Sequence, residues 1–175
     1  MAPGASPGGA PGPSVRRYVA VVGPGDADPD AEQAAERVGR ELAGAGAVVV
    51  CGGLGGVMAA ACRGAREAGG TTVGILPGLD RRAANPWVEI AVPTGLGEAR
   101  NALVVRAADA LVAVGGGFGT LSEIGLALKA GKTVVGLRTW RLARDPGGEV
   151  EAVVRAGSPE EAAAAALNAA SPDTP

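Results

Sequence analysis

The sequence predicts an α/β protein, a single Rossmann-like domain in which an open parallel sheet is flanked by helices. Three observations support this class. Short apolar, β-branched runs without polar alternation recur along the chain, as expected of strands buried on both faces. Stretches of helical length and pattern separate these runs, so strand and helix alternate. Three of the strands run directly into glycine-rich loops, where parallel sheets bind their ligands.

The central strands are expected where the apolar runs lie. These runs are Tyr18–Val22, Ala47–Cys51, Thr71–Leu76, Ala110–Val114 and Thr133–Leu137. The helices between them are expected at Pro29–Ala43, Gly56–Ala68, Gly97–Ala108 and Leu121–Ala130. The alternating stretch Trp87–Val92 fits an extra edge strand or an extended loop, and Gly148–Val154 fits a late strand.

A last helix starts at a clear signal near the end of the chain. Ser158 is expected as its N-cap and Pro159 as its first helical residue, and Glu161 completes a capping box. No linker or internal repeat divides the chain. Residues 15–170 are therefore expected to form one domain, with disordered tails at residues 1–14 and 171–175.

Composition narrows the classes of function. The 175 residues carry a net charge of −2 without a basic block, so neither nucleic acid nor an anionic membrane is expected as a partner. The chain has no histidine, which excludes Ser-His-Asp and Cys-His catalysis and histidine-ligated metals, and no metal site is expected. Cys51 and Cys62 lack CxxC spacing and fit a reducing compartment. The apolar runs are too short to span a bilayer, so a cytoplasmic protein is expected.

Glycines at the ends of three predicted strands form a candidate phosphate site. Glycine lets the backbone approach a phosphate closely, and the N-terminus of the following helix favours the anion. Each loop alone is equally well explained as a tight strand-to-helix turn, but three such loops with a threonine hydroxyl favour phosphate binding. Neither a Walker loop nor the dinucleotide fingerprint is present. The candidate phosphate-binding residues are Gly23, Gly52, Gly53, Gly55, Gly115, Gly116, Gly117, Gly119 and Thr120.

Two charged residues are expected beside these loops. Glu123 follows Thr120 by three residues, so it either faces the ligand pocket or simply stabilises the first turn of its helix through the dipole. Arg100 opens the helix that leads to the strand ending before Gly115. If buried, Arg100 requires an anion, which a phosphate or Glu123 supplies, and the alternative is a solvated surface arginine.

Three segments resemble the LOG family, whose members were once described as lysine decarboxylases. "GGGFGTLSE" (Gly115–Glu123) resembles the family motif PGGxGTxxE. "CGGLGGVMAAACRGA" (Cys51–Ala65) and "GGTTVGILPG" (Gly69–Gly78) resemble two further family segments. The resemblance implies a phosphoribohydrolase that releases a cytokinin base from its nucleoside monophosphate, with Arg100 and Glu123 as catalytic residues. It implies no metal or redox cofactor.

The chain also departs from that family. Gly115 replaces the proline of the motif, Asn101 replaces a lysine, and the stretch Asn85–Asn101 is unlike LOG enzymes. That stretch resembles a sister branch of the same superfamily, also called SLOG, to which the molybdenum cofactor carrier proteins are similar. This second resemblance implies a phosphorylated pterin as ligand and no hydrolysis.

The sequence therefore favours a carrier or sensor for a phosphorylated small molecule, either the molybdenum cofactor or a nucleotide. Asn101 is expected to hydrogen-bond a ring or hydroxyl of the ligand. The alternative is the phosphoribohydrolase. A decarboxylase is disfavoured because that chemistry normally needs a lysine that binds pyridoxal phosphate. Lys129 and Lys132 fall at the opposite edge of the predicted sheet. The small apolar side chains of helices 56–68 and 97–108, together with the resemblance, predict a homodimer or a higher homo-oligomer.

Overall fold

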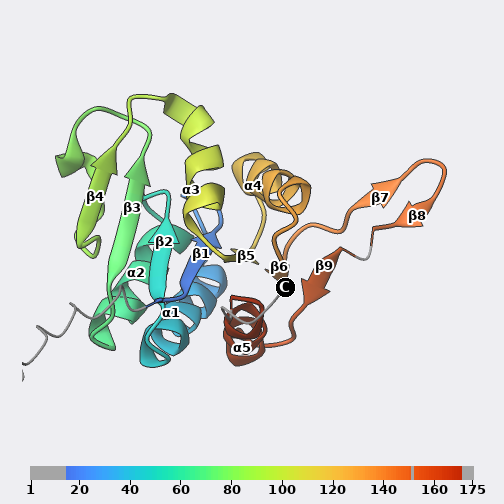
Figure 1. Ribbon diagram of the computed structural model, residues 1–175, viewed down its shortest axis with the longest axis horizontal. Helices are drawn as coiled ribbons and strands as arrows, with labels where there is room; N and C mark the ends of the chain where they lie inside the picture. Colours follow the sequence, from blue (N-terminus) through green and yellow to red (C-terminus); the bar gives the residue numbers. More distant parts are fainter. Residues whose placement is uncertain (1–14, 151, 171–175) are drawn as a thin grey trace, which may run out of the picture.

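The computed structural model describes residues 15–150 and 152–170, and the predicted tails lie outside this range. Its main sheet is parallel and open (Figure 1). The strands are β1 (Tyr18–Val22), β2 (Val48–Cys51), β3 (Thr72–Leu76), β4 (Ile90–Pro93), β5 (Ala110–Val114), β6 (Val134–Leu137) and β9 (Val153–Arg155). Their spatial order is β4-β3-β2-β1-β5-β6-β9. The α/β fold class predicted from the sequence is confirmed.

Strand order reverses between β1 and β5. The chain builds β1 to β4 toward one edge and then returns to place β5, β6 and β9 on the other side of β1. Ligands of open α/β sheets bind outside the carboxyl ends of the strands at such a reversal. The loops after β1 and β5 are the glycine loops that begin at Gly23 and Gly115, so the topology brings these two loops together.

Helices cover both faces of the sheet. They are α1 (Pro29–Gly44), α2 (Val57–Glu67), α3 (Asn101–Ala107), α4 (Phe118–Lys129) and α5 (Pro159–Ala169). One apolar core lies between the sheet and α1, α2 and α5, and a second lies between the sheet and α3 and α4. Valine, leucine, isoleucine and alanine fill both cores, as the shortage of aromatic residues requires.

Helices α1 and α2 approach so closely that their glycines leave no room for a side chain. A Cβ atom added at Gly39 would lie 2.0 Å from the carbonyl oxygen of Ala61, and one at Gly64 would lie 1.9 Å from that of Glu36. The small residues of α2 therefore pack against α1 of the same chain. The intersubunit contact predicted for helix 56–68 stays a prediction.

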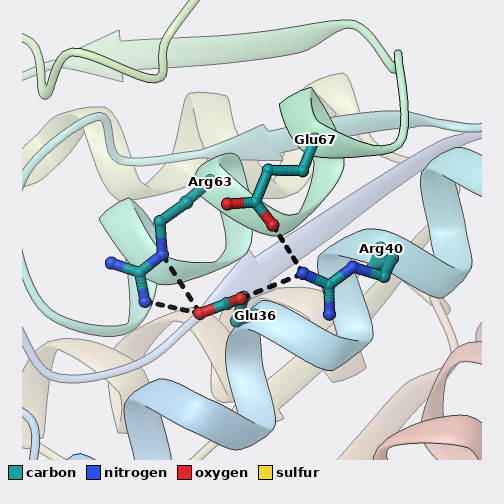
Figure 2. Close-up of polar contacts among 4 residues, drawn as sticks. All are labelled: Glu36, Arg40, Arg63 and Glu67. Carbon is teal, nitrogen blue, oxygen red and sulfur yellow. Dashed lines mark hydrogen bonds and ion pairs between the residues drawn. The ribbon is translucent and has the colours of Figure 1, made fainter.

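Charged side chains bridge the outer edge of the same helix pair (Figure 2). The Glu36 carboxylate accepts hydrogen bonds from Arg63 Nη2 at 2.5 Å and from Arg40 Nη2 at 3.0 Å, and Arg40 also contacts Glu67 at 2.5 Å. These groups are partly exposed, so each ion pair contributes little alone. The network gives α1 and α2 a fixed register above their glycine contact.

Several predicted boundaries change for physical reasons. Trp87–Val92 resolves into the edge strand β4, parallel to β3. The predicted late strand is divided between a small hairpin, β7 (Ala143–Arg144) with β8 (Gly148–Glu149), and the sheet strand β9. The predicted helix 97–108 starts as a 3-10 turn, η2 (Gly97–Arg100), before α3. A shorter 3-10 turn, η1 (Arg81–Ala83), precedes β4.

Capping signals read from the sequence are largely present. Ser158 Oγ accepts from the Glu161 N–H at 3.2 Å, as the capping box requires. The Glu161 carboxylate, however, accepts from Gly157 N–H at 2.8 Å, one residue before the N-cap. Asp28 caps α1 by accepting from Ala31 N–H at 2.8 Å. No described helix is long and apolar enough to cross a bilayer.

Candidate functional site

A cavity of about 480 Å³ opens at the carboxyl ends of the strands, next to the strand reversal. The loops after β1, β2 and β3, the 3-10 turn η2 and the first turns of α2 and α4 form its walls. The lining residues are Gly23, Pro24, Gly25, Asp26, Leu54, Met58, Pro77, Glu98, Arg100, Asn101, Gly117, Gly119, Thr120 and Glu123. Seven of the twelve site residues predicted from the sequence are in this lining.

Arg100 is a buried cation at this cavity. It is 8% exposed. Its Nη2 atom donates to the carbonyl of Gly52 at 3.3 Å, and its Nη1 atom donates to Oδ1 of Asn101. Its Nε atom has no hydrogen-bond partner within the described chain. No carboxylate of residues 15–150 or 152–170 lies within ion-pair distance of the guanidinium, so its charge is left without a partner anion.

Asn101 links this arginine to α4. Its Oδ1 atom accepts from Arg100, and its Nδ2 atom donates to Ser122 Oγ at 3.1 Å. Ser122 Oγ in turn donates to the carbonyl of Gly119 at 2.7 Å. Both ends of the Asn101 amide are therefore engaged inside the protein. Asn101 also lines the cavity, and its expected contact with a ligand stays a prediction.

The glycines after β2 shape the site from behind. A Cβ at Gly52 would lie 2.5 Å from Arg100 Nη2, so this glycine makes room for the guanidinium. A Cβ at Gly53 would lie 2.6 Å from Leu76 Cδ2, and one at Gly55 would lie 3.1 Å from the carbonyl oxygen of Gly25. These three glycines are absent from the cavity wall that the sequence assigned to them.

The glycines after β1 and β5 bring the backbone of two loops together. A Cβ at Gly23 would lie 2.5 Å from the carbonyl oxygen of Val114, so this position admits no side chain. Gly115 adopts a φ of 64°, which only glycine takes without strain. Gly116 packs under Trp140, whose Nε1 atom donates to the carbonyl of Gly117 at 3.1 Å. Gly115 and Gly116 therefore support the loop from outside the cavity wall.

Helix α4 presents its N-terminus to the cavity. It starts at Phe118, three residues earlier than the sequence suggested, with Gly117 as N-cap. Its first intrahelical bond runs from Leu121 N–H to Gly117 O at 3.0 Å. The N–H groups of residues 118–120 precede that bond and have no intrahelical acceptor. The hydroxyl of Thr120 is buried and lacks a partner in the described part of the chain.

Glu123 lies one turn further along α4 and lines the same cavity. It is 6% exposed. Burial raises the pKa of Glu123 to about 7, and the neighbouring Arg100 guanidinium opposes part of this shift. At neutral pH the carboxyl group is therefore balanced between its protonated and ionised forms. Such a poised carboxyl can either donate or accept a proton.

Sequence reasoning missed half of the lining. Gly25 and Asp26 follow β1 directly, and the glycine at the strand end was a usable signal for them. Glu98 lies two residues before Arg100, in the segment that sets this chain apart from the LOG enzymes. Leu54 and Met58 come from the loop and helix after β2, where only glycines were considered. The described residues contain no cluster of three or more acidic or cysteine side chains suited to a metal ion.

Comparison with known families assigns the chain to one protein family. Residues 16–169, nearly all of the described domain, match the SLOG cluster4 family. This chain belongs to the SLOG cluster4 family. The assignment agrees with the superfamily predicted from the glycine motif and covers both the cavity and the helices around it.

Similar proteins include solved structures of the same architecture. This SLOG cluster4 chain superposes with a TM-score of 0.77 on the molybdenum cofactor binding protein of the phototrophic bacterium Rippkaea orientalis, at 39% identity over 84% of this chain and 93% of the other. It superposes equally well, with a TM-score of 0.77, on the Moco carrier protein of Chlamydomonas reinhardtii, at 39% identity over 89% and 98%. An uncharacterized protein of Archaeoglobus fulgidus is 45% identical over 69% of this chain and 79% of its own length.

Proposed function

We propose that this protein is a cytoplasmic carrier or sensor for a phosphorylated small molecule. The observation that carries the proposal is the buried guanidinium of Arg100, which lines the cavity without a partner anion. A buried charge without a counter-charge is costly, and a phosphate removes that cost by forming charge-assisted hydrogen bonds.

The phosphate is proposed to bind at the N-terminus of α4. The backbone N–H groups of residues 118–120 and the helix dipole favour an anion there. Thr120 Oγ1 and Arg100 Nε are buried hydrogen-bonding atoms without partners in the described structure. Phosphate oxygens satisfy both atoms at once, whereas an uncharged hydroxyl group on the ligand satisfies at most part of this set.

The ligand is proposed to be the molybdenum cofactor or a nucleotide. Two supports are independent of each other. The cavity, about 480 Å³, has the size of small-molecule sites in general. Solved structures similar to this chain include proteins named as binding or carrying the molybdenum cofactor. The ligand is cargo or signal, and the protein needs no resident cofactor in this account.

Phosphoribohydrolase activity is the second candidate, and Glu123 favours it. Its carboxyl group is buried at the cavity with a pKa of about 7 and has no hydrogen-bond partner among the described residues. In this reaction water adds across the bond between the sugar carbon and the base, giving ribose 5-phosphate and the free base. Glu123 would take a proton from the water, while Arg100 holds the phosphate.

A homo-oligomer is proposed as the working form, with α3 and α4 at the interface. Leu103 on α3 and Leu126 on α4 expose apolar side chains. Burying this face against a second copy would remove the exposed apolar area from water. Light scattering at micromolar concentration is expected to give a multiple of 16.9 kDa, and a particle of that mass alone would contradict the proposal.

Thermal stability with matched ligands tests the phosphate site. AMP at about 100 times its dissociation constant is expected to stabilise the protein by about 2.7 kcal/mol, while adenosine has no comparable effect. Arg100→Ala should abolish the AMP effect, and Arg106→Ala, which removes an exposed arginine from the adjoining helix α3, should retain it. Equal stabilisation by AMP and adenosine would remove the basis of the proposal.

A second assay decides between carrier and hydrolase. The protein is incubated with AMP or a cytokinin monophosphate, and chromatography measures the free base released. Release of the base supports the hydrolase, and intact nucleotide supports the carrier.

A further inference from the structure

The carboxylate of Glu98 lies between two cavities. It lines the phosphate cavity described above and also a second cavity of about 470 Å³. The second cavity is lined by Glu98, Ala99, Asn101, Ala102, Phe118, Gly119, Ser122 and Leu126. Glu98, Asn101 and Gly119 belong to both walls, so the two cavities adjoin at these residues. Glu98 therefore borders both the cavity of the proposed phosphate site and the second cavity.

The backbone that carries Glu98 is anchored, while its carboxylate is not engaged. In η2, Gly97 N–H donates to the carbonyl of Pro77 at 3.0 Å, and Ala99 N–H donates to Leu96 O at 3.2 Å. The side chain of Glu98 makes no hydrogen bond or ion pair with any residue that the structure describes. Its two carboxylate oxygens are therefore free to accept hydrogen bonds from a ligand.

The other polar side chains in the lining of the second cavity already form hydrogen bonds within the protein. Asn101 bonds to Arg100 and to Ser122, and Ser122 also donates to the carbonyl of Gly119. Glu98 is therefore the polar side chain in this lining that is available to the edge of a ligand ring. Phe118, which is 82% exposed and packs on Trp140 with ring centroids 5.8 Å apart, supplies a flat apolar face beside it.

We propose that Glu98 selects ligands whose ring presents two adjacent N–H donors, as guanine and pterins do with a ring N–H beside their 2-amino group. An ionised carboxylate only accepts hydrogen bonds, and its two oxygens match two neighbouring donors. Adenine presents a ring nitrogen acceptor beside its amino group, so one carboxylate oxygen would face another acceptor. The oxygen and the ring nitrogen would then each lose a hydrogen bond to water and gain none in return. The inference rests on the phosphate site proposed above and names the ring that accompanies the phosphate.

Calorimetric titration of four compounds tests this inference. The compounds are GMP, AMP, 6-hydroxymethylpterin monophosphate and ribose 5-phosphate. The wild-type protein is expected to bind GMP and the pterin phosphate on the order of tenfold more tightly than AMP, because two charge-assisted bonds are gained. A preference for the pterin over GMP, or the reverse, identifies which of the two rings is the natural one.

Two variants locate the selectivity. Glu98→Gln should abolish the preference for GMP over AMP while ribose 5-phosphate still binds, because the amide replaces one of the two acceptor oxygens with an NH2 donor, which would face a ring donor. Glu41→Gln removes the same charge from an exposed position on α1 that lines neither cavity, and it should keep the preference. Equal binding of GMP and AMP by the wild type, or a preference that survives Glu98→Gln, would overturn the role of Glu98. Failure of all four compounds, including ribose 5-phosphate, would instead overturn the phosphate site itself.

Discussion

The Arg100 guanidinium packs directly against the backbone of Gly52. The guanidinium donates from Nη2 to the carbonyl of Gly52 at 3.3 Å, and a Cβ at position 52 would lie 2.5 Å from the same nitrogen. The glycine therefore gives the arginine both an acceptor and the space that it occupies. Its contribution to the site is indirect, through the side chain that it admits.

Gly52→Ala is expected to weaken ligand binding without unfolding the protein. The new methyl group would meet the ends of two flexible side chains, Arg100 and Met58, which can move aside. Displacing the guanidinium should raise the dissociation constant of AMP about tenfold, the effect of losing one charge-assisted hydrogen bond. Gly78→Ala is the control, because nothing lies within 4 Å of a Cβ there. Unchanged AMP affinity in Gly52→Ala would separate Arg100 from binding.

The proposed role of the Thr120 hydroxyl in ligand binding can be tested by comparison with Thr72, whose hydroxyl is hydrogen-bonded within the protein. Thr120 Oγ1 is buried without a partner, whereas Thr72 Oγ1 donates to Trp87 O at 2.7 Å and accepts from Glu89 N–H at 2.9 Å. Thr120→Val should weaken phosphate-ligand binding and leave the stability of the free protein unchanged or higher. Thr72→Val should cost about 1–3 kcal/mol of stability and leave binding intact. Denaturant unfolding and calorimetry measure both, and the opposite pattern would contradict the assignment of Thr120.

Glu123 should make stability depend on pH in a defined window. Its folded pKa of about 7 lies above the ordinary value of 4.5, so the native state binds the proton more tightly than the unfolded state does. The stability that this proton confers is complete below pH 4.5 and is lost as pH rises through 7. The Glu123→Gln variant lacks this loss, so its stability relative to wild type should rise by up to about 3 kcal/mol between pH 4.5 and 8. Urea unfolding of both proteins across this range measures the difference, and a constant difference would refute it.

Gly64 tests the helix contact on the far side of the sheet from the α3–α4 face. Gly64→Ala places a methyl group against the backbone carbonyl of Glu36, which cannot move without shifting α1. The expected loss of stability is about 1–3 kcal/mol. Gly44→Ala, at the end of α1 with open space around it, should be neutral or stabilise the protein. Thermal unfolding of the two variants compares them, and equal melting temperatures would argue against the close contact.

The sequence was informative where a local pattern determines the outcome. Buried strands and their glycine ends follow from apolar runs and from the chemistry of glycine, so the fold class and the edge that carries the cavity were both predictable. The burial of Arg100 and Glu123 was weighed against a surface location, and the structure places both in the cavity wall. Their roles toward a ligand remain predictions.

Side-chain partners across loops were not predictable in the same way. The bond of Asn101 to Ser122 depends on how α3 meets α4, so no local pattern predicts it. Glu98 and Asp26 were missed because a single carboxylate in a loop resembles any solvated surface residue. The glycines after β2 were recognised, but their contact with a side chain from η2 requires the tertiary fold.

The central claim, that a phosphate group neutralises Arg100, is tested most directly by NMR of protein labelled with ¹⁵N-arginine. The signal of the Arg100 Nε–H group, assigned through its loss in Arg100→Lys, is expected to shift when AMP or GMP is added, because this atom gains its missing acceptor. Adenosine and guanosine should leave it in place. An Arg100 signal that responds equally to the nucleosides, or that stays unchanged while a phosphorylated ligand binds, would contradict the account.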